Sequence, residues 1–152
     1  MQVKITCLHD EAILPAYATP GASAMDLHAL IEPDFKKISP TTRYLNAGGT
    51  LIVRTGIAVQ VPDGYGLFVL SRSGHGFKWD VSLANSVGLI DSDYTGEIMV
   101  KLRNDGREAL QVKNGDRIAQ CCILPMPRIE WVQVASLDAT ERGEAGLGST
   151  GV

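Results

Sequence analysis

Short apolar runs alternate with turn signals along most of the chain. Residues 51–70 read LIVRTGIAVQVPDGYGLFVL, in which two β-branched and aromatic runs are separated by Pro-Asp-Gly. Residues 97–124 repeat the pattern, with EIMVKL, EALQV and RIAQCCIL separated by Gly-containing turns. Runs of this length and composition are typical of strands, whereas no window has the 3.6-residue period of a long helix. The pattern predicts an all-β barrel or sandwich-like domain with at most one or two helical turns.

Three segments do not fit the strand pattern. Residues 15–29 and 71–76 are rich in glycine, proline and hydroxyl side chains, and residues 140–152 are rich in glycine without an apolar period. Because the last segment cannot contribute to a core, we expect a domain at residues 1–139 and a mobile C-terminal arm at 140–152. The connection at residues 33–49 is either an ordinary strand connection or a partner-specific loop.

Composition and charge exclude several classes of function. The chain has 152 residues, of which 45% are hydrophobic, so a single domain with a buried core is expected. The formal net charge is -3 and no Lys/Arg run is present, which argues against nucleic acid or an anionic membrane as a partner. The N-terminus lacks a secretion signal and no apolar run is long enough to span a bilayer. We therefore expect a soluble, cytoplasmic protein.

The segment GLIDSDYTGE, residues 88–97, places two carboxylates and a tyrosine between apolar runs. A calcium loop starting at Asp91 would need a bidentate glutamate at its twelfth position, but that position is Leu102. Asp91 and Asp93 are alternatively simple turn formers whose side chains cap backbone amides. That interpretation leaves Tyr94 and the apolar shoulders unexplained.

Five short motifs, in order, resemble those of the trimeric dUTPases, which hydrolyse dUTP to dUMP and pyrophosphate. They are SAMDLHA at 23–29, SRSGHG at 71–76, GLIDSDYTGE at 88–97, GDRIAQ at 115–120 and RGEAGLGSTG at 142–151. The resemblance covers nearly the whole chain. It implies a single-domain dUTPase-like β-barrel or jelly-roll (β-clip) fold and a homotrimer whose active sites combine motifs from different subunits. It also implies a role in limiting uracil incorporation into DNA and in supplying dUMP for dTMP synthesis.

The same resemblance implies the phosphate chemistry. Asp91 is similar to the general base that activates a water for in-line attack on the α-phosphorus. Gln120 resembles the residue that helps to hold phosphate and the attacking water. Asp26 resembles the carboxylate that holds, through water, a Mg²⁺ ion on the triphosphate. The expected phosphate cradle consists of Arg72, Ser73 and Gly74.

Base and sugar recognition are expected from the third motif and the arm. The resemblance implies a hairpin that holds uracil between its two strands, with Tyr94 against the deoxyribose, where it excludes a 2′-hydroxyl. Cytosine would leave buried polar groups unpaired, at about 1–3 kcal/mol each. The expected base-binding residues are Asn85, Gly88, Leu89, Ile90 and Met99. The arm residues expected to close over bound nucleotide are Arg142, Leu147, Gly148, Ser149 and Thr150, with Leu147 where the family usually has an aromatic.

Two alternatives share this fold. A dCTP deaminase would have a similar Arg-Ser loop, although the intact Asp-Ser-Asp-Tyr segment favours hydrolysis of dUTP. A nucleotide-gated regulatory binding protein is the second alternative, and Leu147 in the arm is compatible with it. Ser71 stands where the family commonly has proline and Trp79 where histidine is frequent, but neither change removes a group that the mechanism needs.

Overall fold

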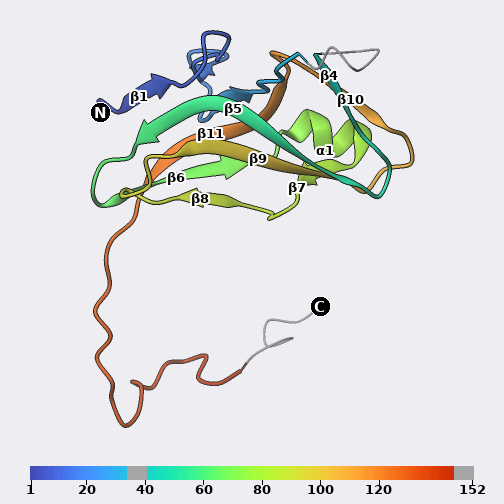
Figure 1. Cartoon of the computed structure of the whole chain (residues 1–152). Helices are drawn as coiled ribbons and strands as arrows, with labels where there is room; N and C mark the ends of the chain where they lie inside the picture. Colours follow the sequence, from blue (N-terminus) through green and yellow to red (C-terminus); the bar gives the residue numbers. More distant parts are fainter. Residues whose placement is uncertain (34–40, 146–152) are drawn as a thin grey trace.

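The described part of the chain folds into three antiparallel β-sheets and one short helix (Figure 1). The computed structural model describes residues 1–33 and 41–145. The elements are β1 Lys4–Cys7, β2 Ala16–Tyr17, β3 Met25–His28, β4 Thr42–Leu45, β5 Thr50–Gln60, β6 Tyr65–Leu70, α1 Ser73–Trp79, β7 Val81–Leu83, β8 Gly88–Ile90, β9 Glu97–Asn104, β10 Leu110–Lys113 and β11 Arg117–Pro125. The strand orders are β1-β5-β9-β7, β2-β3-β11-β6-β8 and β10-β4. The all-β prediction is confirmed.

The two larger sheets enclose the hydrophobic core between them. Strand β9 shows how the sequence alternation produces this arrangement, because Ile98, Val100 and Leu102 are each 1% exposed while the residues between them point outward. From the other sheet, Leu27 on β3 and Ala119 on β11 are completely buried in the same cluster. Strands of both sheets therefore contribute alternate residues to one core, as in a β-sandwich.

The Pro-Asp-Gly turn at residues 62–64 does not close a hairpin within one sheet. Strand β5 before it belongs to the four-stranded sheet, and β6 after it belongs to the five-stranded sheet. Gly64 takes a positive φ of 78°, which glycine adopts without steric cost. The turn signal was correctly assigned, but its function is to transfer the chain from one sheet to the other.

A bulge in β5 anchors the end of the third motif. The register between β5 and β9 shifts between Arg54 and Ala58, and Gly56 within the bulge has a φ of 69°. The Glu97 carboxylate accepts a hydrogen bond from the Gly56 N–H at 2.8 Å and from Arg54 Nε at 3.0 and 3.1 Å. A Cβ at Gly56 would lie 2.7 Å from the Leu30 side chain. These contacts fix the point at which β9 begins.

Helix α1 follows β6 directly and was not located from the sequence, although its seven residues fit the expected one or two turns. Arg72 is the N-cap residue, in an extended conformation. Asp80 ends the helix in the left-handed conformation, and its N–H donates to the Gly76 carbonyl at 3.2 Å. Two glycines within seven residues give no apolar period from which the helix could be predicted.

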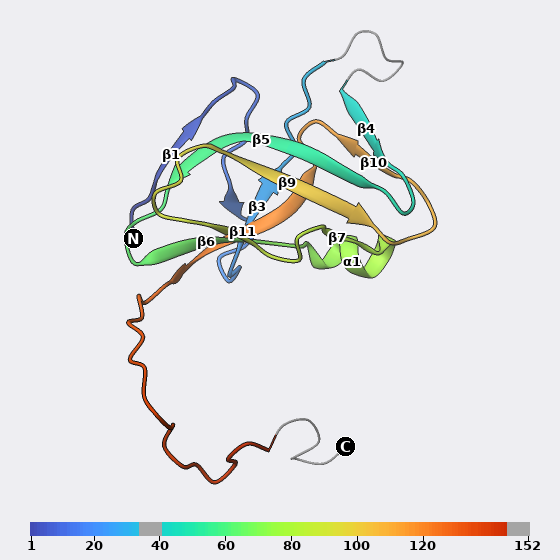
Figure 2. The ribbon, with the colours of Figure 1, turned by 60° about the horizontal axis from the view of Figure 1, so that its bottom comes forward.

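The chain after β11 leaves the body, as two views show (Figures 1 and 2). Residues 126–145 form neither strand nor helix and are exposed. Five apolar side chains in this segment are 54–89% exposed, namely Ile129, Trp131, Val132, Val134 and Leu137. The last strand therefore ends at Pro125, whereas the domain boundary at residue 139 and the closing arm at 140–152 stay predictions.

Part of the connection at residues 33–49 is ordinary sheet. Its β4 segment pairs with β10 over four residues, from Thr42 opposite Lys113 to Leu45 opposite Leu110. Residues 34–40 lie outside the described part of the chain. Within residues 1–33 and 41–145, no helix has the length and apolar composition needed to cross a membrane.

Candidate active site

Side chains from three of the five motifs meet around Asp26. Asp26 on β3 lies directly opposite Gln120 on β11, so the two side chains project from the same face of the sheet. Gln120 Nε2 donates to Asp26 Oδ1 at 3.3 Å, and Arg72 Nε lies 3.3 Å from the same oxygen. Arg117 Nη1 donates to Asp26 Oδ2 at 3.4 Å. We call these four residues the phosphate cluster.

Arg117 belongs to the phosphate cluster because of a second bulge. In a regular strand, Arg117 and Gln120 would point to opposite faces, since they are three positions apart. The register between β3 and β11 shifts between Arg117 and Ala119, where one extra residue is inserted. The extra residue reverses the side-chain alternation, so Arg117 and Gln120 both reach Asp26. Alternation alone gives no signal for this, and the sequence analysis assigned Arg117 no role.

The phosphate cluster is net positive. Its two guanidinium groups face one carboxylate, and the Asp26 side chain is only 7% exposed. Next to it, burial lowers the pKa of His28; the Asp26 charge raises it, while Arg117 and Arg72 lower it further. A neutral His28 leaves an excess of one positive charge in a partly buried site. Such a site favours binding of an anion.

The expected cradle residues follow Arg72 at the start of α1. Ser73 is exposed, and a Cβ built at Gly74 would meet no atom within 4 Å. Packing within this chain therefore does not require glycine at that position, and a ligand has room to approach the backbone there. Ser71 also has a role that was missed, because its Oγ accepts a hydrogen bond from the Leu83 N–H at 2.9 Å.

The two strands of the third motif open apart instead of pairing with each other, and a hairpin that holds uracil between them stays a prediction. Strand β8 pairs with β6 in the five-stranded sheet, whereas β9 pairs with β5 and β7 in the four-stranded sheet. The segments that flank the motif are joined before it by the Ala84 N–H, which donates to the Lys101 carbonyl at 2.8 Å. Beyond it the two segments separate, because each completes a different sheet. Strand β8 is consequently an edge strand, with one backbone edge not used by β6.

The residues expected around the base line the separated segments. Asn85, Leu89 and Met99 are exposed, with Leu89 at 45% and Met99 at 57%, and Gly88 and Ile90 are half-buried. Gly88 has no space for a side chain, since its Cβ would lie 3.0 Å from Val69 Cβ. The segments therefore leave the apolar side chains of Leu89 and Met99 open to solvent in the single chain.

Tyr94 folds back over the turn that contains Asp91. Its hydroxyl donates to the Glu97 carbonyl at 3.0 Å, and its ring is 43% exposed. A Cβ at Gly96 would lie 2.6 Å from the hydroxyl oxygen, so glycine there leaves space for the ring. Asp91 itself is exposed and borders an open pocket of about 660 Å³, together with Leu89, Met126 and Arg128.

Asp91 does not reach the phosphate cluster within one chain. Strand register places Leu70 opposite Gln120, and Ile90 opposite Leu67, so Asp91 lies four positions along the sheet and two strands away from Gln120. With a rise of about 3.4 Å per residue and a distance of about 4.8 Å between strands, that separation is about 17 Å. Arg142 lies on the exposed tail, where its Nε donates to the Ala145 carbonyl at 3.0 Å. Leu147, Gly148, Ser149 and Thr150 lie outside the described residues.

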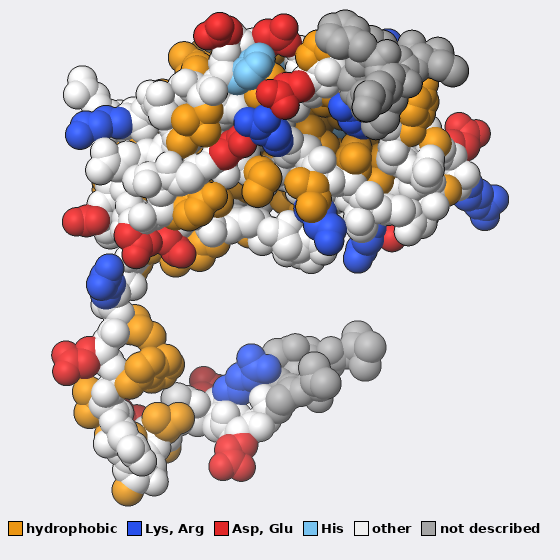
Figure 3. Space-filling view, viewed as in Figure 1, with side chains coloured by type: hydrophobic (Ala, Val, Ile, Leu, Met, Phe, Trp, Pro, Cys, Tyr) orange, Lys and Arg blue, Asp and Glu red, His pale blue; other side chains and the backbone are white. Residues whose placement is uncertain are grey.

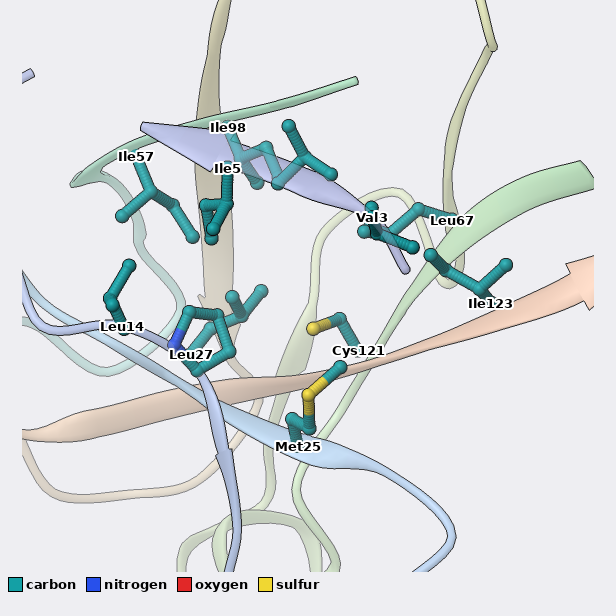
Figure 4. Close-up of a pocket in the computed structure, with 12 residues that line it drawn as sticks. Val3, Ile5, Leu14, Met25, Leu27, Ile57, Leu67, Ile98, Cys121 and Ile123 are labelled. Atoms are coloured by element: carbon teal, nitrogen blue, oxygen red, sulfur yellow. The ribbon is translucent and has the colours of Figure 1, made fainter. Parts of the chain in front are cut away.

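A second pocket, of about 200 Å³, is not a candidate for this chemistry (Figure 4). It lies between β1 and the five-stranded sheet and is lined by apolar residues and Cys121. Burial raises the pKa of the Cys121 thiol to about 12, with further contributions from Cys122 and Asp26. The thiol is therefore protonated and unreactive at neutral pH.

The comparison with protein families agrees with the motif assignment. A dUTPase family model matches residues 10–151, almost the entire chain. The chain belongs to the dUTPase family. Among curated relatives, the deoxyuridine 5'-triphosphate nucleotidohydrolase of Anaplasma marginale is 45% identical over 91% of this chain and 88% of its own length. The enzyme of that name from Dictyoglomus turgidum is 43% identical, over 100% and 99% of the two chains.

Solved dUTPase structures share the fold. The dUTPase of Staphylococcus bacteriophage 80alpha with dUPNHPP has a TM-score of 0.81 and 25% identity, and covers 99% of both chains. A G164S mutant of that phage enzyme with dUpNHpp has a TM-score of 0.84 at 23% identity, also over 99% of both chains. The phage 80alpha protein is described as controlling the transfer of virulence genes. A dUTPase of phage phi11 of S. aureus, described with a structural Mg(II) ion, has a TM-score of 0.77 at 20% identity and covers 91% of this chain and 100% of its own.

The arrangement of acidic, histidine and cysteine side chains shows what kind of Mg²⁺ site this dUTPase family member could form. Within the described residues, no three His, Cys, Asp or Glu side chains are placed to hold a metal ion. Mg²⁺ bound to a nucleotide commonly keeps several waters and touches few protein groups. Asp26, with both carboxylate oxygens facing arginines, fits such a contact through water and does not fit a dedicated protein cage.

Proposed function

We propose that the protein is a dUTP diphosphatase that hydrolyses dUTP to dUMP and pyrophosphate. The phosphate cluster carries this proposal, because three separate motifs converge on one net-positive, partly buried site. The relatives at 43–45% identity are named for this reaction, and they cover 91–100% of the chain. The biological role would be to limit uracil incorporation into DNA and to supply dUMP for dTMP synthesis.

The proposed mechanism divides the work between the cluster and Asp91. Arg72, Arg117 and Gln120 bind and orient the triphosphate, with Ser73 and the Gly74 N–H completing the cradle. Asp91 accepts a proton from the water that attacks the α-phosphorus, a contribution of about 10²–10⁴ in rate for a positioned base. Gln120 helps to orient that water. Bound Mg²⁺ would neutralise charge on the triphosphate, with Asp26 holding it through water.

Uracil is proposed to bind at the free edge of β8. An edge strand presents unpaired backbone N–H and C=O groups, and a pyrimidine edge can use them in place of another strand. Asn85 and Met99 flank this edge from the two separated segments. Thymine would be rejected by close packing against its methyl group, and Tyr94 would leave no room for a ribose 2′-hydroxyl.

The active protein is proposed to be a homotrimer with shared sites. The separation of about 17 Å between Asp91 and Gln120 is too great for one water to bridge. Each phosphate cluster would therefore receive Asp91 from a neighbouring subunit. The exposed apolar residues of 126–145 support assembly, because a row of uncovered apolar side chains is characteristic of an interface (Figure 3). Arg142, Leu147, Gly148, Ser149 and Thr150 would come from an arm that closes over bound nucleotide.

Coexpression of two inactive variants tests both the reaction and the sharing of sites. Asp91→Asn and Arg72→Ala are each expected to release almost no pyrophosphate from dUTP with Mg²⁺. In random mixed trimers, a shared site has both wild-type residues in about one quarter of cases, so activity should return to about a quarter of the wild-type value. Sites built within one chain would give no recovery at any mixing ratio.

The substrate panel distinguishes the remaining alternatives. Pyrophosphate release from dUTP, but not from dTTP, dCTP or UTP, would support the proposed specificity. Ammonia release from dCTP would replace the proposal with a deaminase. Tight binding of dUTP without turnover by the wild-type trimer would replace it with a nucleotide-gated regulatory protein.

A further inference from the structure

His75 is the inward-facing residue of an otherwise exposed helix. Its side chain is 8% exposed, whereas Phe77 on the same helix is 93% exposed and Trp79 is 46% exposed. The imidazole packs at 5.3 Å, ring centre to ring centre, from the Trp79 ring. It points towards Arg72, one turn earlier in the chain. A polar ring buried at this position calls for a partner, because burial without one is costly.

That partner is the Arg72 guanidinium. With this contact included, one can say which N–H groups of Arg72 are used within the chain. His75 Nε2 lies 3.2 Å from Arg72 Nη1, and Arg72 Nη1 also donates to the Arg117 carbonyl at 3.1 Å. Arg72 Nε faces Asp26 Oδ1 at 3.3 Å. These contacts occupy Nε and both hydrogens of Nη1. Among the described residues no hydrogen bond uses Nη2, so its two N–H groups are available to a phosphate.

The contact defines the protonation state of His75. Arginine stays protonated and can only donate, so His75 Nε2 must supply its lone pair and the ring proton must be on Nδ1. Nδ1 is buried, without a hydrogen-bond partner among the described residues. Burial lowers the pKa of His75, and the Arg72 charge lowers it further, while Asp116 raises it. Burial and the Arg72 charge outweigh Asp116, so the balance favours a neutral ring.

The charges around His75 come from two other parts of the fold. A space of about 200 Å³ beside the ring is lined by Val112 from β10, by Asp116 in the β10–β11 turn, and by Arg117 and Ile118 from β11. Two cations, Arg72 and Arg117, therefore face one anion, Asp116. One oxygen of the Asp116 carboxylate, Oδ2, accepts a hydrogen bond from the Lys113 N–H at 2.8 Å. A proton added to His75 would meet two arginines and only one carboxylate, Asp116.

We propose that neutral His75 is a positioning residue that fixes the Arg72 guanidinium so that Nη2 faces the substrate phosphates, and that protonation of His75 releases Arg72. The inference rests on the proposed function only in taking a triphosphate as the ligand of Arg72. A charged imidazole can no longer accept from Nη1, and it places a second positive charge 3.2 Å from the guanidinium. Arg72 would then turn away from the cluster, and triphosphate binding would weaken at acid pH.

The test compares three substitutions with the wild-type trimer. His75→Gln keeps an acceptor at the position of Nε2 but cannot be protonated, His75→Asn places its oxygen one bond too short, and His75→Leu has no acceptor. At pH 8 we expect His75→Leu and His75→Asn to weaken binding of inorganic triphosphate about tenfold, the loss of one charged hydrogen bond. His75→Gln should stay within about twofold of wild type. For dUTP turnover the change should appear in KM, with kcat nearly unchanged.

The pH profile distinguishes positioning from a merely structural role. As the pH is lowered from 8 to 5, the affinity of the wild-type protein for triphosphate should fall more steeply than that of His75→Gln. The affinity of the variant divided by that of the wild type should therefore rise steadily. Parallel profiles would overturn the proposal, as would an unchanged affinity in a folded His75→Leu protein. Thermal unfolding of all variants provides the check on folding.

Imidazole ¹⁵N NMR supplies a readout that does not depend on catalysis. With His75→Gln used for assignment, the His75 ring should be the neutral Nδ1–H tautomer at pH 7.5. An Nε2–H tautomer or a doubly protonated ring at that pH would contradict the proposal. If the wild-type protein bound triphosphate but did not hydrolyse dUTP, the proposed function would fail while the tautomer and affinity measurements would still decide the role of His75.

Discussion

Asp26 and Asp91 differ in burial and in hydrogen-bonding partners. Asp26 is 7% exposed and is held by two arginines and a glutamine from two other motifs. Asp91 is exposed, at the start of a turn that connects two different sheets. One carboxylate is part of a preassembled, cross-linked cluster, and the other is presented at the surface.

The difference fits the roles proposed for the two groups. A phosphate-binding cluster works by holding donors in fixed positions, and cross-strand pairing between β3 and β11 supplies that rigidity within one chain. A general base must instead reach a water and the reacting phosphorus, and a carboxylate buried among arginines could not do so. The fold therefore assembles the phosphate cluster within the chain and leaves Asp91 exposed, as the proposed sharing of sites between subunits requires.

The largest expected effect comes from Asp91→Asn. The substitution keeps the shape of the side chain but removes the base, so kcat should fall at least about 100-fold. Because Asp91 is exposed, the free energy of unfolding should change by less than about 0.5 kcal/mol, and the Kd for dUTP should stay within about threefold. Steady-state turnover, calorimetric binding and thermal unfolding measure the three quantities. A variant that lost binding as strongly as turnover would place Asp91 in the binding site and remove the contrast with Asp26.

Asp26→Asn is the matched change in the other region. Removing one partner of a buried ion pair leaves the remaining charges uncompensated, so we expect the free energy of unfolding to fall by about 2 kcal/mol. The cost is below that of a fully buried pair because the Arg117 side chain is 53% exposed. Denaturant unfolding of the two Asp→Asn variants side by side gives the comparison. Equal stability of the two variants would show that the cluster contributes nothing to folding.

Most strands could be predicted, and the reasons are visible in β9 and α1. The alternation in EIMVKL reports directly which residues face the core, so its strand assignment was secure. Helix α1 has seven residues with two glycines, and its formation depends on the position of β6 and β7 and not on a local signal. Turn residues such as Pro-Asp-Gly show where a strand ends. They do not show which sheet the next strand joins, so no signal in the sequence indicates that β8 and β9 belong to different sheets.

The site was predictable in its residue types but not in its connections. Motif resemblance identified Asp26, Arg72 and Gln120, and the structure brings these three together. Arg117 was missed because a bulge reverses the side-chain alternation between it and Gln120. His75 was missed because nothing in SRSGHG indicates which way a short helix will turn. In each case the missing information is the register of one element against another, which is a tertiary property.

The smallest expected effect concerns how Tyr94 is held over the turn. Gly96→Ala would place a methyl group 2.6 Å from the Tyr94 hydroxyl, so the ring must move away from the Glu97 carbonyl. Because the displaced atom is the end of a side chain, we expect no loss of folding and about a threefold rise in KM for dUTP, with a similar loss of discrimination against UTP. Tyr94→Phe is the control, since it removes the exposed hydrogen bond but keeps the ring in place, and its KM should change less than about twofold. If the two variants behaved alike, the hydroxyl contact and not the ring position would determine sugar selection. The exposed turn that contains Asp91 would then depend on that single hydrogen bond for its conformation.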